Sequence, residues 1–302
     1  MKAVIVDKIN KSYGPVRALK GLSFEVRQGE LFGLIGPDGA GKTTLFRILA
    51  TLMDADSGTA LVEGLDVAKD YNQIRQIVGY MPGKFSLYQD LTVEENLKFF
   101  ATVFNTTIEE NYSLIKDIYC QIEPFKKRRA GKLSGGMKQK LALSCALIHK
   151  PKVLFLDEPT TGVDPVSRKE FWAMLSSLKQ QGISIVVSTP YMDEARLCDR
   201  IALIQDGSIL NIDTPQGIVD SYSERLLAVR SNRMHRLQAD LIEYPGVKTS
   251  FAFGDSYHIT IEDDFKTDML NTFLSSKGHK DIEIETISPS VEDCFMSMLV
   301  KK

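Results

Sequence analysis

The octapeptide GPDGAGKT, residues 36–43, gives the most direct evidence of fold class in this chain. It follows the apolar run LFGLIG (31–36) and opens the helix-like run TTLFRILATLM (43–53). Glycines allow left-handed backbone angles that turn the amides of such a loop inward, and the helix N-terminus adds partial positive charge. The pattern G-x-x-x-x-G-K-[ST] between a strand and a helix therefore predicts a phosphate-binding loop.

Each part of this loop has a predicted role toward a nucleotide. Lys42 is expected to reach the outer phosphates, and Thr43 to ligate Mg²⁺. The neighbouring amides form the anion cradle. The predicted cofactors are thus ATP and Mg²⁺. The predicted ATP-binding residues of the loop are Gly36, Pro37, Asp38, Gly39, Ala40, Gly41, Lys42, Thr43 and Thr44.

A second part of the pattern lies around residue 157. KVLFLDE (152–158) and ISIVVST (183–189) are short apolar strand patterns, separated by SRKEFWAMLSSLKQQG (167–182), which is apolar at helical spacing. Strand, crossover helix and strand indicate a buried parallel sheet. Asp157 is predicted to complete the Mg²⁺ shell, and Glu158 to act as the catalytic general base. A solvated strand end is the alternative, and the phosphate loop argues against it.

The last third of the chain has a different pattern. Gly254-Asp255 separates two alternating strand patterns and predicts a hairpin. The full order is βαββαβ, a ferredoxin-like arrangement. We therefore expect an α/β domain over residues 1–216, a smaller α+β domain over 217–302, and a linker at TPQG (214–217). The other elements of the second domain are strands at 225–232 and 282–287 and helices at 234–244 and 265–278.

Composition excludes several classes. The chain has 302 residues and a net charge of −2, so there is no electrostatic case for nucleic-acid binding. The four cysteines lie far apart without a CxxC pair, which fits a reducing cytosol better than a zinc cluster or disulfide scaffold. The N-terminus does not read as a signal peptide, and no apolar run reaches the roughly 18 residues that a membrane span needs.

LSGGMKQK (133–140) lies shortly before the acidic pair and makes the pattern specific. Together with the phosphate loop, LDEP (156–159) and GVDP (162–165), it resembles the ATP-binding-cassette (ABC) family. The resemblance covers residues 1 to about 215. It implies a P-loop NTPase fold with a RecA-like core and a helical subdomain, to which LTVEENLKFFATVFN (91–105) would belong.

The resemblance also implies that two chains share each ATP. Ser134 would begin a helix, and its hydroxyl and the following amides would form a second anion-binding terminus. In a head-to-tail dimer, the signature Leu133, Ser134, Gly135 and Gly136 would face the ATP of the other chain. Asp164 resembles the residue that touches the opposite site, and Tyr13 the aromatic that stacks on adenine. The alternative for Tyr13 is a core tyrosine.

Over its whole length the chain resembles ATP-binding subunits of ABC-2-type exporters, including the ending ISPSVEDCFMSML (287–299). The implied partners are transmembrane permease subunits and a second ABC ATPase, at the cytoplasmic face of the membrane. FSLYQDL (85–91) is a candidate docking surface for the permease, or simply core of the helical subdomain. The final domain is expected to serve dimer contact or regulation, or to be a packed appendage.

Two positions depart from the family pattern. Gly83 stands where a glutamine normally contacts Mg²⁺ and the attacking water, and Pro190 where a histidine normally holds the γ-phosphate. Gln89 is too far along the chain to replace the glutamine. Proline has neither a side-chain donor nor an N–H. His149 is expected to be a solvated loop residue and no substitute.

These departures predict the hydrolysis-impaired half of an asymmetric pair, with a hetero-dimer favoured and a homo-dimer possible. Losing one preorganised transition-state donor costs roughly 10²–10³ in rate. Competing classes are a soluble ABC ATPase acting on ribosomes, a chromosome or DNA-repair type, and a silent scaffold. The single cassette argues against the ribosome-acting class, and the absence of sustained heptads argues against the chromosome or DNA-repair type. The intact Lys42 argues against a silent scaffold.

Overall fold

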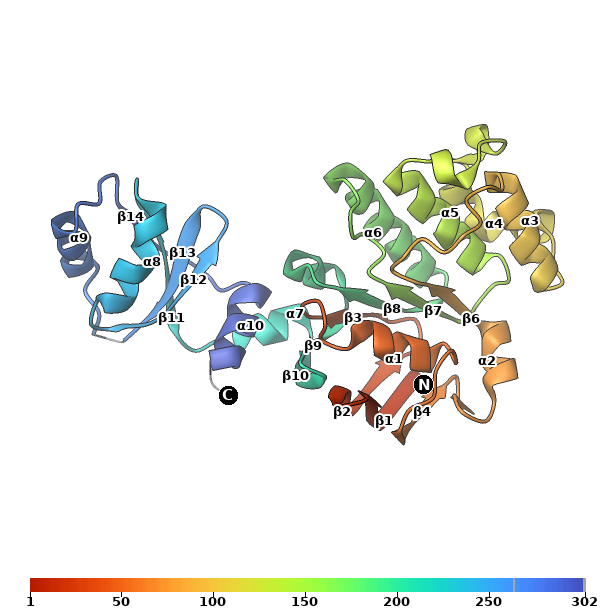
Figure 1. Ribbon diagram of the computed structural model, residues 1–302, viewed down its shortest axis with the longest axis horizontal. Coiled ribbons are helices and arrows are strands. Elements are labelled where there is room, and N and C mark those ends of the chain that lie inside the picture. Colours follow the sequence, from red (N-terminus) through yellow and green to blue (C-terminus); the bar gives the residue numbers. More distant parts are fainter. Residues whose placement is uncertain (263, 301–302) are drawn as a thin grey trace. The chain divides into compact units, whose positions relative to one another are not determined.

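The computed structural model describes residues 1–262 and 264–300. The chain forms two compact units, Met1–Pro215 and Gln216–Lys302 (Figure 1). Among the described residues, every helix is too short or too polar to cross a membrane.

A six-stranded sheet forms the centre of the first unit, in the order β10-β9-β3-β8-β7-β6. All neighbouring strands are parallel except β9 and β10. Every residue of β3, β7 and β8 is buried, as expected for parallel strands covered on both faces. The α/β prediction is therefore confirmed. The strands are β3 (Leu31–Ile35), β6 (Val78–Met81), β7 (Val153–Asp157), β8 (Ser184–Thr189), β9 (Arg200–Gln205) and β10 (Ser208–Asp213).

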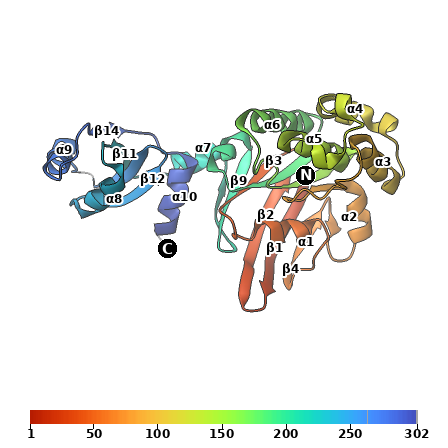
Figure 2. The ribbon, with the colours of Figure 1, turned by 45° about the horizontal axis from the view of Figure 1, so that its top comes forward.

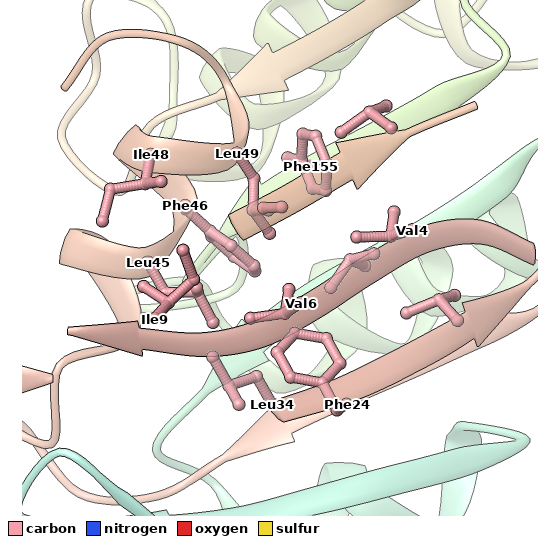
Figure 3. Packing of buried hydrophobic residues seen from close by; sticks show 14 of the residues in the cluster. Val4, Val6, Ile9, Phe24, Leu34, Leu45, Phe46, Ile48, Leu49 and Phe155 are labelled. Atoms are coloured by element: carbon pink, nitrogen blue, oxygen red, sulfur yellow. The ribbon is translucent and has the colours of Figure 1, made fainter. Parts of the chain in front are cut away.

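A second, antiparallel sheet has the order β2-β1-β4-β5. Helix α1 (Lys42–Leu49) packs in the core that this sheet shares with the central one. Figure 3 shows Phe46 of α1 turned toward Phe155 of β7, with the ring centroids 5.9 Å apart. This packing fixes the N-terminus of α1 against the end of β3. The strands of this sheet are β1 (Lys2–Tyr13), β2 (Val16–Arg27), β4 (Ser57–Val62) and β5 (Leu65–Asp66).

Helices α3, α4 and α5 gather into a subdomain beside the central sheet (Figures 1 and 2). The helix expected within residues 91–105 is α3 (Val93–Val103). Thr92 and Thr107 open α3 and α4 with capping boxes, in which each threonine and a following glutamate satisfy free backbone amides. The other helices are α2 (Tyr71–Ile77), α4 (Ile108–Tyr119), α5 (Gly135–Leu147) and α6 (Pro165–Gln180), with 3₁₀ turns at Glu123–Phe125, Ala130–Lys132 and Met192–Leu197.

The second unit has the predicted βαββαβ order, and its sheet runs β12-β13-β11-β14. The hairpin turns at Gly254-Asp255, and α8 and α9 cover an apolar core that includes Leu237 and Leu270. The boundary between the two units, after Pro215, lies within the predicted linker at 214–217, and a helix begins there at Pro215, the position where proline is tolerated. The elements are α7 (Pro215–Asp220), β11 (Arg225–Arg230), α8 (Met234–Glu243), β12 (Val247–Phe253), β13 (Ser256–Ile261), α9 (Thr267–Ser276), β14 (Glu283–Thr286) and α10 (Val291–Val300).

Candidate nucleotide-binding site

The phosphate loop joins the end of β3 to the start of α1. Gly39 and Gly41 have φ angles of 80° and 99°, which side chains rarely adopt. Gly36 is required for a different reason: an added Cβ would lie 2.1 Å from the carbonyl oxygen of Ile204. Glycine thus supplies backbone freedom at two positions and close approach at the third. Both are needed to curl the loop amides inward.

Lys42 is buried at this loop, with only 3% of the residue exposed. Its Nζ donates to the carbonyl oxygens of Gly36 and Pro37 at 2.8 and 2.9 Å. Nζ also lies 3.1 Å from Oε1 of Glu158, at the end of a different strand. The structure therefore brings together the predicted phosphate-binding lysine and the predicted general base.

Asp157 is the last residue of β7 and is 2% exposed. The hydroxyl of Ser188 donates to Asp157 Oδ1 at 2.7 Å and accepts the N–H of Glu158 at 3.0 Å. Glu158 has a φ of 49°, an unfavourable angle for a side-chain-bearing residue and one often found at functional positions. Burial and the charge of Asp157 raise the pKa of Tyr80 to about 12. The Ser188 hydroxyl therefore orients the carboxylate of Asp157, and the Lys42 ammonium orients that of Glu158, at the carboxyl edge of the sheet.

Thr43, in the first turn of α1, and Asp157, at the end of β7, carry oxygen donors of the kind that Mg²⁺ prefers. Among residues 1–262 and 264–300, no group of three or more His, Cys, Asp or Glu side chains could hold a metal. Mg²⁺ commonly uses one or two protein ligands and completes its octahedron with phosphate oxygens and water. Hard oxygen donors beside the phosphate loop match this requirement.

The two departing positions both adjoin the site. A Cβ on Gly83 would lie 3.0 Å from the carbonyl oxygen of Asp157 and 3.8 Å from its Oδ2. Pro190 follows Thr189, whose carbonyl oxygen accepts the N–H of Gly36 at 3.2 Å. The residues predicted to be degenerate therefore border the aspartate and the phosphate loop, and neither offers a side-chain donor.

Tyr13 ends β1 and is 44% exposed, so its alternative as a core tyrosine is wrong. Its hydroxyl donates to the sulfur of Met53 at 3.0 Å. Adenine stacking at Tyr13 stays a prediction.

Ser134 caps α5, as predicted, and its hydroxyl accepts the N–H of Met137 at 3.3 Å. A Cβ on Gly136 would lie 2.6 Å from Oγ of Ser167, so the signature helix packs tightly on α6. Asp164 caps α6, and the N–H of Ser167, which it accepts at 3.0 Å, lowers the pKa of its carboxyl. Leu133 is buried and Gly135 is exposed.

The expectation that His149 is a solvated loop residue is wrong. Its ring stacks on Phe104 with centroids 3.8 Å apart, and Nε2 lies 3.1 Å from the carbonyl oxygen of Val78. Burial lowers its pKa. The histidine lines an apolar cavity of about 540 Å³ together with Phe85 and Leu87. Its position just after α5, against α3, explains the burial, and its contacts give it no part in phosphate binding.

A protein-family model described as "ABC transporter" matches residues 19–161, which include the phosphate loop, the signature and the acidic pair. The Nod factor export ATP-binding protein I of Burkholderia lata is 40% identical over 216 residues, which are 70% of this chain and 71% of that protein. This chain belongs to the ABC transporter family of ATP-binding proteins.

Two further relatives of this ABC protein are also named as ATP-binding proteins. The linearmycin resistance ATP-binding protein LnrL of Bacillus subtilis is 36% identical over 69% of this chain and 68% of its own length. The probable multidrug ABC transporter ATP-binding protein YbhF of Escherichia coli is 39% identical over 93% of this chain. The chain spans about half of YbhF, since the match covers 49% of that protein.

Solved structures place the first unit among ABC cassettes. The cbiO1 protein of Clostridium perfringens aligns with a TM-score of 0.65 and 26% identity, over 73% of this chain and 91% of that one. A dimeric ATP-binding cassette solved in a post-hydrolysis state with ADP and Pi aligns with a TM-score of 0.64 and 25% identity, over 70% and 98%. The P-loop NTPase fold is thus confirmed.

Proposed function

We propose that this chain is the ATP-binding, energy-coupling subunit of an ABC-2-type exporter. The observation that carries the proposal is Lys42, buried in a glycine loop with its Nζ 3.1 Å from Glu158. The loop amides and Lys42 would hold the phosphates, Thr43 and Asp157 would ligate Mg²⁺, and the exposed face of Tyr13 would receive the adenine.

Two ATPase subunits would sandwich each ATP. Ser134 caps α5, so the first turn of this helix offers free amides and a partial positive charge to an anion. In the proposed head-to-tail dimer, Leu133, Ser134, Gly135 and Gly136 complete the site of the second subunit, and Asp164 contacts it. The solved cassette with ADP and Pi, which is itself dimeric, supports this arrangement.

This chain would be the hydrolysis-impaired member of an asymmetric pair. Gly83 borders Asp157 without a side chain, and Pro190 borders the phosphate loop without a donor. Binding depends on the loop and Lys42, whereas hydrolysis also depends on groups that hold water and the γ-phosphate. A consensus-like ATPase is therefore the favoured partner, although a homo-dimer would place the same signature at both sites.

The transmembrane partner would be an ABC-2-type permease at the cytoplasmic face of the membrane. Support comes from relatives whose names include Nod factor export and multidrug transport. Within FSLYQDL (85–91), Phe85 and Leu87 line the apolar cavity, while Tyr88 is 51% exposed and its ring packs edge-on against Phe99. This mixture of cavity and exposed aromatic surface suits a docking segment.

ATP binding and turnover by the purified full chain test the proposal. We expect Mg²⁺-dependent ATP binding that Lys42→Ala abolishes, with slow hydrolysis. Absence of ATP binding would refute the function itself. Robust hydrolysis that Glu158→Gln abolishes would refute only the impaired-half role. Co-purification from native membranes should recover a permease and a second ATPase; recovery of ribosomes instead would favour the soluble-ATPase alternative.

A further inference from the structure

Two loops beside the candidate site meet at one buried carboxylate. Glu194 lies in the 3₁₀ turn Met192–Leu197 and is 1% exposed. Its Oε1 accepts the hydroxyl of Thr160 at 2.7 Å, and its Oε2 accepts the hydroxyl of Thr189 at 2.5 Å. The two oxygens of one side chain thus hold two segments that are distant in sequence.

Each threonine belongs to a segment with a role in the site. Thr189 ends β8 immediately before Pro190, and its carbonyl oxygen accepts the N–H of Gly36 in the phosphate loop. Thr160 is 1% exposed and lies in the loop that runs from Glu158 to Asp164. Glu194 therefore links the segment bonded to the phosphate loop with the segment that carries the general base.

The charge of Glu194 is compensated from α6. Nε of Arg168 lies 3.5 Å from Oε1 of Glu194, and the guanidinium sits over the ring of Tyr191, 4.1 Å from its centroid. Burying a carboxylate is costly unless it is paired and hydrogen-bonded. Here one cation and two hydroxyls meet that need, so removal of any one of them weakens a shared network.

We propose that Glu194 is a positioning residue that couples the segment ending at Pro190 to the loop carrying Glu158 and Asp164. Pro190 supplies neither an N–H nor a side-chain donor, so the hydroxyl of Thr189 is the hydrogen-bonding link from this segment to Glu194. A shift of Gly36 on nucleotide binding reaches Thr189 through the hydrogen bond from the Gly36 N–H to the Thr189 carbonyl oxygen. Glu194 then transmits this shift to Thr160. This inference rests on the ATP site proposed above.

Hydrogen exchange of the full chain, with and without Mg²⁺ and ATP, tests the coupling without requiring fast hydrolysis. In the wild type, nucleotide should slow exchange in residues 36–43 and also in 158–164. Thr189→Val should keep the first effect and reduce the second by about tenfold or more, because a hydrogen bond to a charged acceptor is removed. Thr189→Ser, which keeps the hydroxyl, should restore it.

Thr160→Val should produce the same loss, and the double variant should lose little more, because both changes break the path through Glu194 and both keep the bonds from the Glu158 N–H to Ser188. Glu30→Gln is the matched control: Glu30 is 6% exposed and paired with Arg200 at 3.2 Å, but it precedes the amino end of β3. It should lower stability without uncoupling 158–164. Full protection of 158–164 in Thr189→Val would overturn the inference. Absence of protection at 36–43 in the wild type would instead refute the ATP site.

Discussion

The phosphate loop and the segments around Gly83 and Pro190 differ sharply, although Gly83 adjoins Asp157 and Thr189, just before Pro190, is hydrogen-bonded to Gly36 of the loop. The loop keeps every group that anion binding needs, with Lys42 buried and its glycines in special conformations. The opposite side offers a bare backbone at Gly83 and a proline at position 190. In the proposed function, retention of nucleotide and its hydrolysis therefore depend on different groups. Each can be altered separately.

Restoring the missing groups should have the largest effect. Pro190→His should raise the rate of ATP hydrolysis by roughly 10²–10³, the usual value of one preorganised transition-state donor. ATP affinity should change little. A steady-state phosphate-release assay measures the rate, and equilibrium binding of a fluorescent ATP analogue measures the affinity. Pro190→Phe, which adds a ring without a donor, is the control; an equal rise with phenylalanine would show that the effect is steric.

Lys42→Ala tests the phosphate loop, where every predicted binding group is present. It removes a charge-assisted donor to phosphate, so the Kd for ATP should rise by about 100-fold or more. Equilibrium binding of a fluorescent ATP analogue measures this. Lys179→Ala, which breaks a comparable ion pair with Asp199 at 2.8 Å, should leave the Kd unchanged. If Lys42→Ala left the Kd for ATP unchanged, the phosphate loop would not be the ATP-binding site.

Gly36→Ala tests whether the loop is shaped by close packing. Because the new Cβ would meet the carbonyl oxygen of Ile204 at 2.1 Å, the free energy of unfolding should fall by about 1–3 kcal/mol. Gly39→Ala is the comparison, since its Cβ would meet nothing within 4 Å and only its φ of 80° is unfavourable. Urea unfolding measures both variants. A larger loss at Gly39 would make backbone conformation the dominant requirement.

The smallest expected effect is a dependence of the free energy of unfolding on pH. Burial lowers the pKa of His149, so the unfolded chain binds a proton more readily than the folded chain does. Stability should therefore rise with pH toward the unperturbed pKa of about 6.5 and then level off. His149→Phe, which can still stack on Phe104, should flatten this dependence. Urea midpoints at pH 5 and 7.5 report the difference, and substitution of the exposed His235 should not change it.

The sequence predicts features that are local along the chain. The glycine loop, the hairpin at Gly254-Asp255 and the cap at Ser134 all depend on a few adjacent residues, and the structure contains each of them. Residues 36–43 alone indicate the fold class. Position-by-position matching also placed Gly83 and Pro190 beside the site.

Long-range hydrogen bonds could not be predicted in this way. Ser188 is 31 residues from Asp157, and Thr160 is 34 residues from Glu194, so adjacency of strands in the sheet is what brings them together. A hydroxyl at the carboxyl end of β8 was the available signal, but it has meaning only once β8 is known to neighbour β7. The burial of His149 could not be predicted for the same reason, because its ring stacks on Phe104, which follows α3 and is far away in the sequence.

The tight contact between α5 and α6 has a genetic consequence. Gly136 leaves no room for a side chain against Ser167, so the signature and the Asp164 cap are held in one arrangement within the subunit. Both would face the nucleotide of the other subunit in the proposed dimer. Gly136→Val should therefore spare ATP binding by its own chain and impair hydrolysis at the partner's site. Such an allele would place its defect at the ATP site of the other subunit, whereas Lys42→Ala would be defective in its own chain.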